Sequence, residues 1–176
     1  MGVNGCRMSV AGCRLPVVGT RAAGRGVRWR DPDSAQRIRS RYDAFVITVI
    51  FACVHNAGRS QMAAAIFNAF ADPEIARAVS AGTHPAERVH PEVVQVMHEV
   101  GVDLSGATPR GLSDGITREA NWLITMGCGE QCPVIPGVRR DDWPIDDPKG
   151  KPLAEVRRIR EDIELRVRSL LWLINA

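Results

Sequence analysis

Short apolar runs alternate along the chain with longer segments in which apolar residues recur every three or four positions. Short runs rich in Val and Ile are typical of strands buried on both faces, and the three-to-four spacing is typical of helices. The runs predict strands at residues 45–52, 75–81 and 122–126, with a weaker one at 138–143. The periodic segments predict helices at residues 61–70, 90–100, 113–120 and 152–174.

This alternation predicts the fold class. Strands joined by helices of these lengths form right-handed βαβ units, which build a parallel sheet covered by helices on both faces. The last helix has the most regular pattern, with apolar side chains on one face and mixed charges on the other. Its apolar residues are Leu153, Val156, Ile159, Ile163, Val167, Leu170 and Ile174.

Composition and charge divide the chain into two parts. With 176 residues, 45% hydrophobic and 24% charged, the chain fits one globular domain, and no apolar run approaches the roughly 20 residues that cross a bilayer. Residues 1–43 hold nine Arg against three Asp and lack periodicity, so we expect a poorly ordered basic extension. The remaining residues, 44–176, form the predicted domain and carry a net negative charge, which argues against nucleic-acid binding.

The first predicted strand ends in a chemical motif. Cys53 and Arg59 are separated by five residues, and Ser60 and a predicted helix follow at once. A loop of this length can turn its backbone N–H groups inward, and the helix N-terminus adds partial positive charge. We therefore expect an oxyanion to bind here. The binding residues would be Val54, His55, Asn56, Ala57, Gly58, Arg59 and Ser60.

The same environment would activate Cys53 as a nucleophile. Amide donors, the Arg59 guanidinium and the Ser60 hydroxyl all favour the thiolate over the thiol, and Arg59 can bind two anion oxygens at once. The spacing of Cys53 and Arg59 also occurs by chance. In the alternative interpretation Cys53 is simply a small buried residue and Arg59 a surface charge at the helix start. The agreement of strand, spacing, Arg-Ser pair and helix favours a catalytic site.

With this motif the chain resembles the low-molecular-weight protein tyrosine phosphatases and the arsenate reductases built on the same fold. HNAGRSQMA at residues 55–63 is similar to the arsenate reductase branch, and further similar segments follow it. These are SAGTHP at 80–85, VHPEVVQVM at 89–97, ITMGCGEQCP at 124–133 and DWPIDDP at 142–148. The resemblance implies a flavodoxin-like three-layer α/β sandwich with a four-stranded parallel sheet of order 2-1-3-4.

The resemblance also suggests a general acid. A group leaving the bound anion needs a proton, which a carboxylic acid on a loop at the same sheet edge can supply. In the resembling family the Asp directly before a Pro in this loop is the acid, and here that residue is Asp147. A solvated acidic turn is the alternative for this segment.

Two cysteines after the third strand are candidates for redox partners of Cys53. Cys128 and Cys132 flank three residues, and a packed structural pair is the alternative; zinc would need further Cys or His ligands nearby. In thioredoxin-linked reductases the second and third redox cysteines are several residues further apart than Cys128 and Cys132 are here. In this respect the chain is more similar to actinobacterial reductases that use mycothiol. The three residues between Cys128 and Cys132 permit a local disulfide, but we expect an external thiol to attack the arsenic adduct, so that no bond joins the two cysteines after turnover. The donor would be mycothiol with a mycoredoxin-type protein, with thioredoxin as the alternative.

Together these features predict an arsenate reductase without a tightly bound cofactor or metal. Its substrate would be arsenate or a phosphate-like oxyanion, and an odd count of five cysteines favours a reducing cytoplasm. The alternative is a phosphatase in which water resolves a phosphocysteine. Trp143 is the one aromatic residue near the acid loop, which argues against tyrosine-directed activity. A non-catalytic anion-binding protein is a third interpretation.

Overall fold

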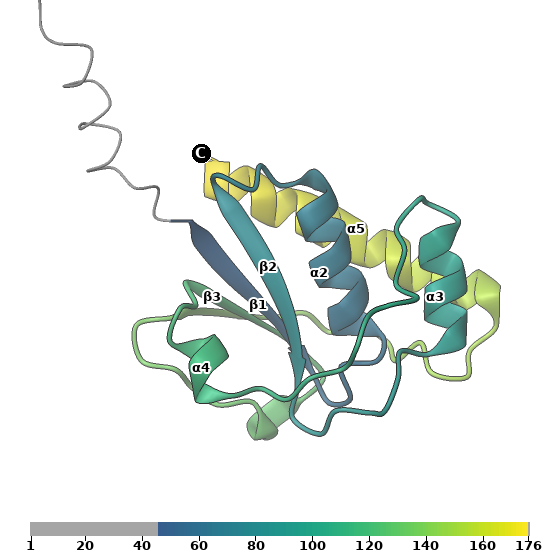
Figure 1. Cartoon of the computed structure of the whole chain (residues 1–176), viewed down its shortest axis with the longest axis horizontal. Helices are drawn as coiled ribbons and strands as arrows, with labels where there is room; N and C mark the ends of the chain where they lie inside the picture. The colour runs from purple at the N-terminus through teal and green to yellow at the C-terminus, as the bar shows by residue number, and fades with distance from the viewer. Residues whose placement is uncertain (1–45, 176) are drawn as a thin grey trace, which may run out of the picture. The chain divides into compact units, whose positions relative to one another are not determined.

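The computed structural model describes residues 46–175, so the predicted extension at residues 1–43 lies outside the described residues. Four strands form one parallel sheet in the order β2-β1-β3-β4 (Figure 1). Their bounds are Ile47–Cys53 for β1, Ala76–Gly82 for β2, Trp122–Met126 for β3 and Arg139–Asp142 for β4. The predicted α/β fold and strand order are confirmed.

Strand β1 lies inside the sheet and is buried on both faces. Val49, Phe51 and Cys53 belong to the larger core cluster, whereas Ile50 and Ala52 belong to a smaller cluster on the other face. A strand with both faces covered has no position for a polar side chain in water, which explains why its sequence is apolar apart from Thr48. The Thr48 hydroxyl accepts a hydrogen bond from Arg77 Nε. Its register ends with Cys53 paired to Gly82 on β2 and to Met126 on β3.

The two faces of the sheet are covered unequally (Figure 1). On one face the larger core cluster contains residues of helices α2 (Arg59–Phe70), α3 (Pro91–His98) and α5 (Leu153–Asn175). On the other lie the short helix α4 (Asp114–Thr117) and the 3-10 helix η1 (Gly129–Gln131). Helix α4 has half the predicted length, and none of its side chains is fully buried, although Ile116 packs partly against the smaller core cluster.

Helix α2 begins two residues earlier than predicted. Gly58 is its N-cap residue, so Arg59 and Ser60 stand in the first helical turn. The loop that follows β1 therefore has only five residues, 54–58, and its end coincides with a helix N-terminus. This short connection holds the predicted anion loop at the carboxyl edge of the sheet. Within residues 46–175 no helix is long and apolar enough to cross a membrane.

Candidate active site

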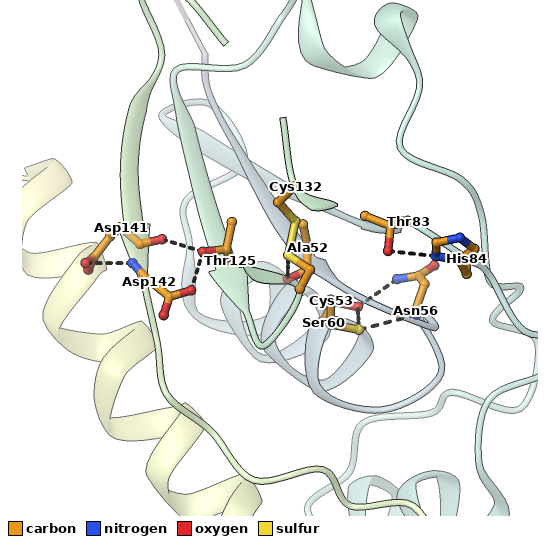
Figure 2. The surroundings of a disulfide bond; sticks show 11 residues. Ala52, Cys53, Asn56, Ser60, Thr83, His84, Thr125, Cys132, Asp141 and Asp142 are labelled. Atoms are coloured by element: carbon orange, nitrogen blue, oxygen red, sulfur yellow. Dashed lines mark hydrogen bonds between the residues drawn. A yellow bond between two sulfur atoms is a disulfide. The ribbon is translucent and has the colours of Figure 1, made fainter. Parts of the chain in front are cut away.

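The sulfur of Cys53 lies at the end of β1 against the start of α2. Its Sγ atom is 3.0 Å from Ser60 Oγ and accepts a hydrogen bond from the backbone N–H of Asn56 at 3.3 Å (Figure 2). Cys53 is buried and is the free cysteine of the described residues. The backbone N–H of Asn56 and the hydroxyl of Ser60 thus both lie within hydrogen-bonding distance of the Cys53 sulfur.

Asn56 fixes the shape of the loop and the direction of the Ser60 hydroxyl. Its Oδ1 atom accepts hydrogen bonds from the backbone N–H of Arg110 at 2.8 Å and from Gln61 Nε2 at 3.1 Å. Its Nδ2 group therefore faces Ser60 Oγ, to which it donates at 2.8 Å. The Ser60 hydroxyl accepts this bond and keeps its own proton, which it can donate to a thiolate at Cys53 Sγ. Asn56 also has a positive φ of 49°, a backbone conformation that asparagine tolerates better than most residues.

Arg59 joins the loop after β1 to the loop that carries the predicted acid. Its Nη2 group donates to Asp147 Oδ2 at 2.8 Å, and its Nη1 group donates to the carbonyl of Ile145 at 3.2 Å. The guanidinium also lies against Gly127, where a Cβ atom would stand 2.5 Å from Nη1. Three segments far apart in the sequence thus meet at Arg59, and Asp147 stands beside the anion loop as predicted.

These residues line one small cavity. Its walls are Cys53, His55, Ala57, Gly58, Arg59, His90 and Asp147. Pro148, on the loop that carries Asp147, packs against Gly58 of the anion loop. A Cβ atom on Gly58 would lie 2.6 Å from Pro148 Cγ. Among the other predicted anion-loop residues, Val54, Asn56 and Ser60 are not in the wall. Asn56 and Ser60 instead contact the sulfur of Cys53 and each other.

His90 is a site residue that the sequence analysis missed. It is the N-cap of α3, directly before Pro91, and its side chain also lines the cavity. Its backbone N–H donates to the carbonyl of Ala57 at 2.9 Å. Burial lowers the pKa of His90 below its usual 6.5, although the carboxylates of Glu92 and Asp147 act in the opposite direction. Its role in the wall depends on tertiary packing, and no local sequence signal pointed to it.

Cys128 and Cys132 are joined in a disulfide, with Cα atoms 5.7 Å apart (Figure 2). The 3-10 helix η1 brings the two sulfurs together, so the local disulfide that the sequence permitted is present here, against the external-thiol expectation of no such bond after turnover. Both are buried in the smaller core cluster, and Cys128 Sγ lies 3.9 Å from the carbonyl oxygen of Ala52. Cys53 belongs to the larger cluster on the opposite face. The disulfide and Cys53 are therefore separated by the backbone of β1.

Two further residues near the acid loop have structural contacts. Trp143 is buried against Phe51, with ring centroids 5.5 Å apart, and does not line the cavity. Asp146 is exposed and lies 3.5 Å from Lys151 Nζ. Across residues 46–175, no group of three or more His, Cys, Asp and Glu side chains is arranged to hold a metal ion.

Comparisons with known proteins agree on one family. The model of the low molecular weight phosphotyrosine protein phosphatases matches residues 48–176. A Halobacterium salinarum protein whose name marks it as a candidate arsenate reductase is 44% identical over 128 residues, which cover 68% of this chain and 87% of that protein.

Two solved structures are similar in fold and sequence. The thioredoxin-dependent arsenate reductase of Corynebacterium glutamicum has a TM-score of 0.66 and 38% identity, covering 78% of this chain and 66% of that chain. The arsenate reductase of Archaeoglobus fulgidus has a TM-score of 0.60 and 34% identity, covering 70% of this chain and 98% of that chain.

Proposed function

Because the chain belongs to the low molecular weight phosphotyrosine protein phosphatase family, we propose that it is an arsenate reductase with Cys53 as its nucleophile. The observation that carries the proposal is the meeting of Cys53, Arg59 and Asp147 in one small cavity. A sulfur nucleophile, a cation for the oxyanion and a candidate acid are the three groups that the first step requires.

In the first step arsenate binds in the loop of residues 54–60 with its charge facing the backbone N–H groups and Arg59. The Cys53 thiolate attacks arsenic, and an arsenic–oxygen bond breaks. Once the oxyanion has replaced Asp147 at Arg59, Asp147 acts in its protonated carboxylic acid form. The leaving oxygen takes that proton and departs as water, while arsenic stays in its +5 state on sulfur. The hydrogen bonds from Ser60 and Asn56 to Cys53 Sγ support the thiolate that begins this step.

In the second step a thiolate attacks Cys53 sulfur. A sulfur–sulfur bond forms, and the pair of electrons from the sulfur–arsenic bond reduces arsenic to the +3 state, released as arsenite. We assign this thiolate to Cys128, whose sulfur lies against the backbone of the residue before Cys53. Cys132 then attacks Cys128 and releases the Cys53 thiolate, which leaves the Cys128–Cys132 bond found in the structure.

A reducing partner must restore the two cysteines after each turnover. A thioredoxin-type dithiol protein suits an internal disulfide, since exchange between two dithiols consumes no other reagent. Mycothiol with a mycoredoxin-type protein remains the competing donor, and it would attack the Cys53 adduct directly. Either donor fits a reducing cytoplasm, in which Cys53 stays a free thiol.

Phosphatase activity is the second candidate function, and the family model that matches the chain favours it. Phosphate has the shape and charge of arsenate, and Cys53 would form a phosphocysteine that water resolves. Among the described residues, no Phe, Tyr or Trp side chain lines the cavity to hold a tyrosyl ring, and Trp143 packs in the core instead. We therefore rank hydrolysis of phosphate esters below arsenate reduction.

The experiment is an assay of arsenite formation by the reduced full chain with three donors in parallel. One contains thioredoxin and its reductase, one contains mycothiol with mycoredoxin, and one contains glutathione. Hydrolysis of p-nitrophenyl phosphate is measured beside them. We expect arsenite formation in at least one arm, and we expect Cys53→Ser to abolish both reactions because a serine hydroxyl is not ionised in this site. Ester hydrolysis without arsenite formation in any arm would favour the phosphatase.

A further inference from the structure

His90 lies in the wall of the cavity but belongs neither to the anion loop nor to the acid loop. Its main chain and its side chain have separate contacts. The backbone N–H binds the carbonyl of Ala57, and the imidazole faces the cavity near Gly58. A substitution at this position therefore changes the cavity wall while it leaves the backbone hydrogen bond available.

The imidazole stands on the same side of the cavity as the acid loop. The point where a Cβ atom of Gly58 would lie is 3.5 Å from His90 Cδ2 and 2.6 Å from Pro148 Cγ. The carboxylate of Asp147 is close enough to His90 to affect its pKa. His90 and Pro148 thus border the region next to Asp147, the proposed acid.

This region is where the leaving group must pass. Displacement at a tetrahedral oxyanion is in line, so the leaving oxygen lies opposite the attacking sulfur and next to the acid. For arsenate that oxygen departs as water. In a phosphate ester it carries an organic group, which must extend outward between Asp147 and its neighbours.

We propose that His90 is a specificity-determining residue whose imidazole occupies the exit path of an ester group and so restricts the cavity to free oxyanions. The inference rests on the proposed function, because it takes Cys53 as the nucleophile and Asp147 as the acid. It adds a residue, outside both loops, that separates small inorganic substrates from esters.

His90 acts here through its size. The charged and titratable groups that face it are Glu92, Asp147, Lys149 and His55, and burial is the largest influence on its pKa, which is lowered. A pKa below 6.5 leaves the imidazole mainly uncharged at pH 7, so it adds little positive charge to the oxyanion site. Its remaining contribution is the volume of a planar ring at the cavity wall.

The test compares two activities in His90→Ser, His90→Phe and the wild type. Serine is small and is a favoured helix N-cap, so the first variant opens the wall without weakening the start of α3. Phenylalanine keeps a planar ring of similar size. His84→Ala is the matched control, because His84 is an exposed histidine that contacts Thr83 and does not line the cavity.

We expect His90→Ser to raise the ratio of kcat/KM for p-nitrophenyl phosphate to kcat/KM for arsenate by about tenfold, the scale of discrimination by a small steric change in a pocket. His90→Phe and His84→Ala should keep the wild-type ratio. A partial loss of folded protein lowers both activities together and leaves the ratio unchanged. An unchanged ratio in His90→Ser, or an equal rise in His90→Phe, would overturn the proposal.

A second measurement separates this inference from the proposed function. The inhibition constant of inorganic phosphate and the KM of the ester are measured in the same variants. If the wild type forms no arsenite, arsenate reduction fails, but a lower ester KM in His90→Ser with an unchanged phosphate constant still supports the role of His90. If the wild type reduces arsenate and both constants stay unchanged, only the role of His90 is overturned.

Discussion

Arg59 and Asp147 are paired with each other, since Nη2 of the arginine donates to Oδ2 of the carboxylate at 2.8 Å. The cation proposed to bind the oxyanion therefore has an anionic partner already. The Asp147 side chain is 44% exposed, so solvent screens the pair, and its net contribution is at most about 1 kcal/mol. An incoming oxyanion can compete for the guanidinium at this cost.

The substitution Asp147→Asn tests two properties of Asp147: its role as the acid and its competition with the oxyanion for Arg59. The amide cannot supply a proton, so we expect kcat for p-nitrophenyl phosphate and for arsenate to fall by about a hundredfold or more. Inorganic phosphate should bind as well as before or better, because the competing carboxylate charge is gone. Steady-state kinetics with phosphate as inhibitor measures both effects. An unchanged kcat would show that another group protonates the leaving oxygen.

Gly127→Ala should weaken anion binding through Arg59. A Cβ atom at this position would lie 2.5 Å from Arg59 Nη1, so the guanidinium must shift. Loss of a good charge-assisted hydrogen bond corresponds to about 2 kcal/mol, so we expect the phosphate inhibition constant to rise by at least about tenfold.

The control for this variant is Gly137→Ala, at the other end of the same loop. Both glycines have a positive φ, 73° and 79°, and a Cβ atom on Gly137 would meet nothing within 4 Å. Both variants should lose about 1–2 kcal/mol of stability from the backbone strain. Equal inhibition constants in the two variants would mean that Arg59 adapts without loss.

The parts of the site that follow from the sequence are those encoded locally. Cys53, Asn56, Arg59 and Ser60 lie within eight residues, so a strand, a short loop and a helix start suffice to bring them together. Asp147 is 88 residues from Arg59 and was found through family resemblance rather than through any pattern.

The features that were missed depend on packing between distant segments. His90 reaches the cavity because the start of α3 binds the carbonyl of Ala57, a contact that no periodicity encodes. Trp143 lies near the acid loop in sequence, but its side chain points to the core against Phe51. The Cys128–Cys132 bond depends on whether three residues form a tight turn, and their sequence alone allowed both outcomes.

The lowered pKa of His90 predicts a pH dependence of stability. The unfolded chain binds a proton at His90 near pH 6.5, whereas the folded chain binds it only at lower pH, chiefly because of burial. The contribution of the neutral imidazole is thus complete above pH 6.5 and is lost as the pH falls below it. Between pH 7.5 and 5.0 the wild type should lose more stability than His90→Ser in urea unfolding. Equal losses would contradict the assignment.

Removal of residues 1–43 should leave activity and melting temperature nearly unchanged. Both core clusters of the described structure are built from residues between 47 and 174, and the removed segment lacks a core-forming pattern. Thermal melts and the arsenite assay on the truncated chain measure this. Lower solubility or a lower melting temperature of the truncated chain would show that the segment contributes to the folded domain.

Cys128→Ser and Cys132→Ser test the internal relay. The two sulfurs lie on the opposite face of the sheet from Cys53, so the loop that carries them must rearrange during turnover. Glycines with positive φ at 127, 129 and 137 lie in this loop and are suited to such a change.

With thioredoxin as donor, each serine variant should lose at least about a hundredfold in turnover, because a tethered thiol acts at a far higher effective concentration than a free one. Cys132→Ser should accumulate a Cys53–Cys128 disulfide, since its resolving sulfur is missing, and mass spectrometry after one turnover detects this bond. Cys128→Ser lacks the attacking sulfur and should retain arsenic on Cys53. If both variants keep most of their activity with mycothiol and none of these disulfides forms, the external thiol attacks the adduct and the Cys128–Cys132 bond is structural.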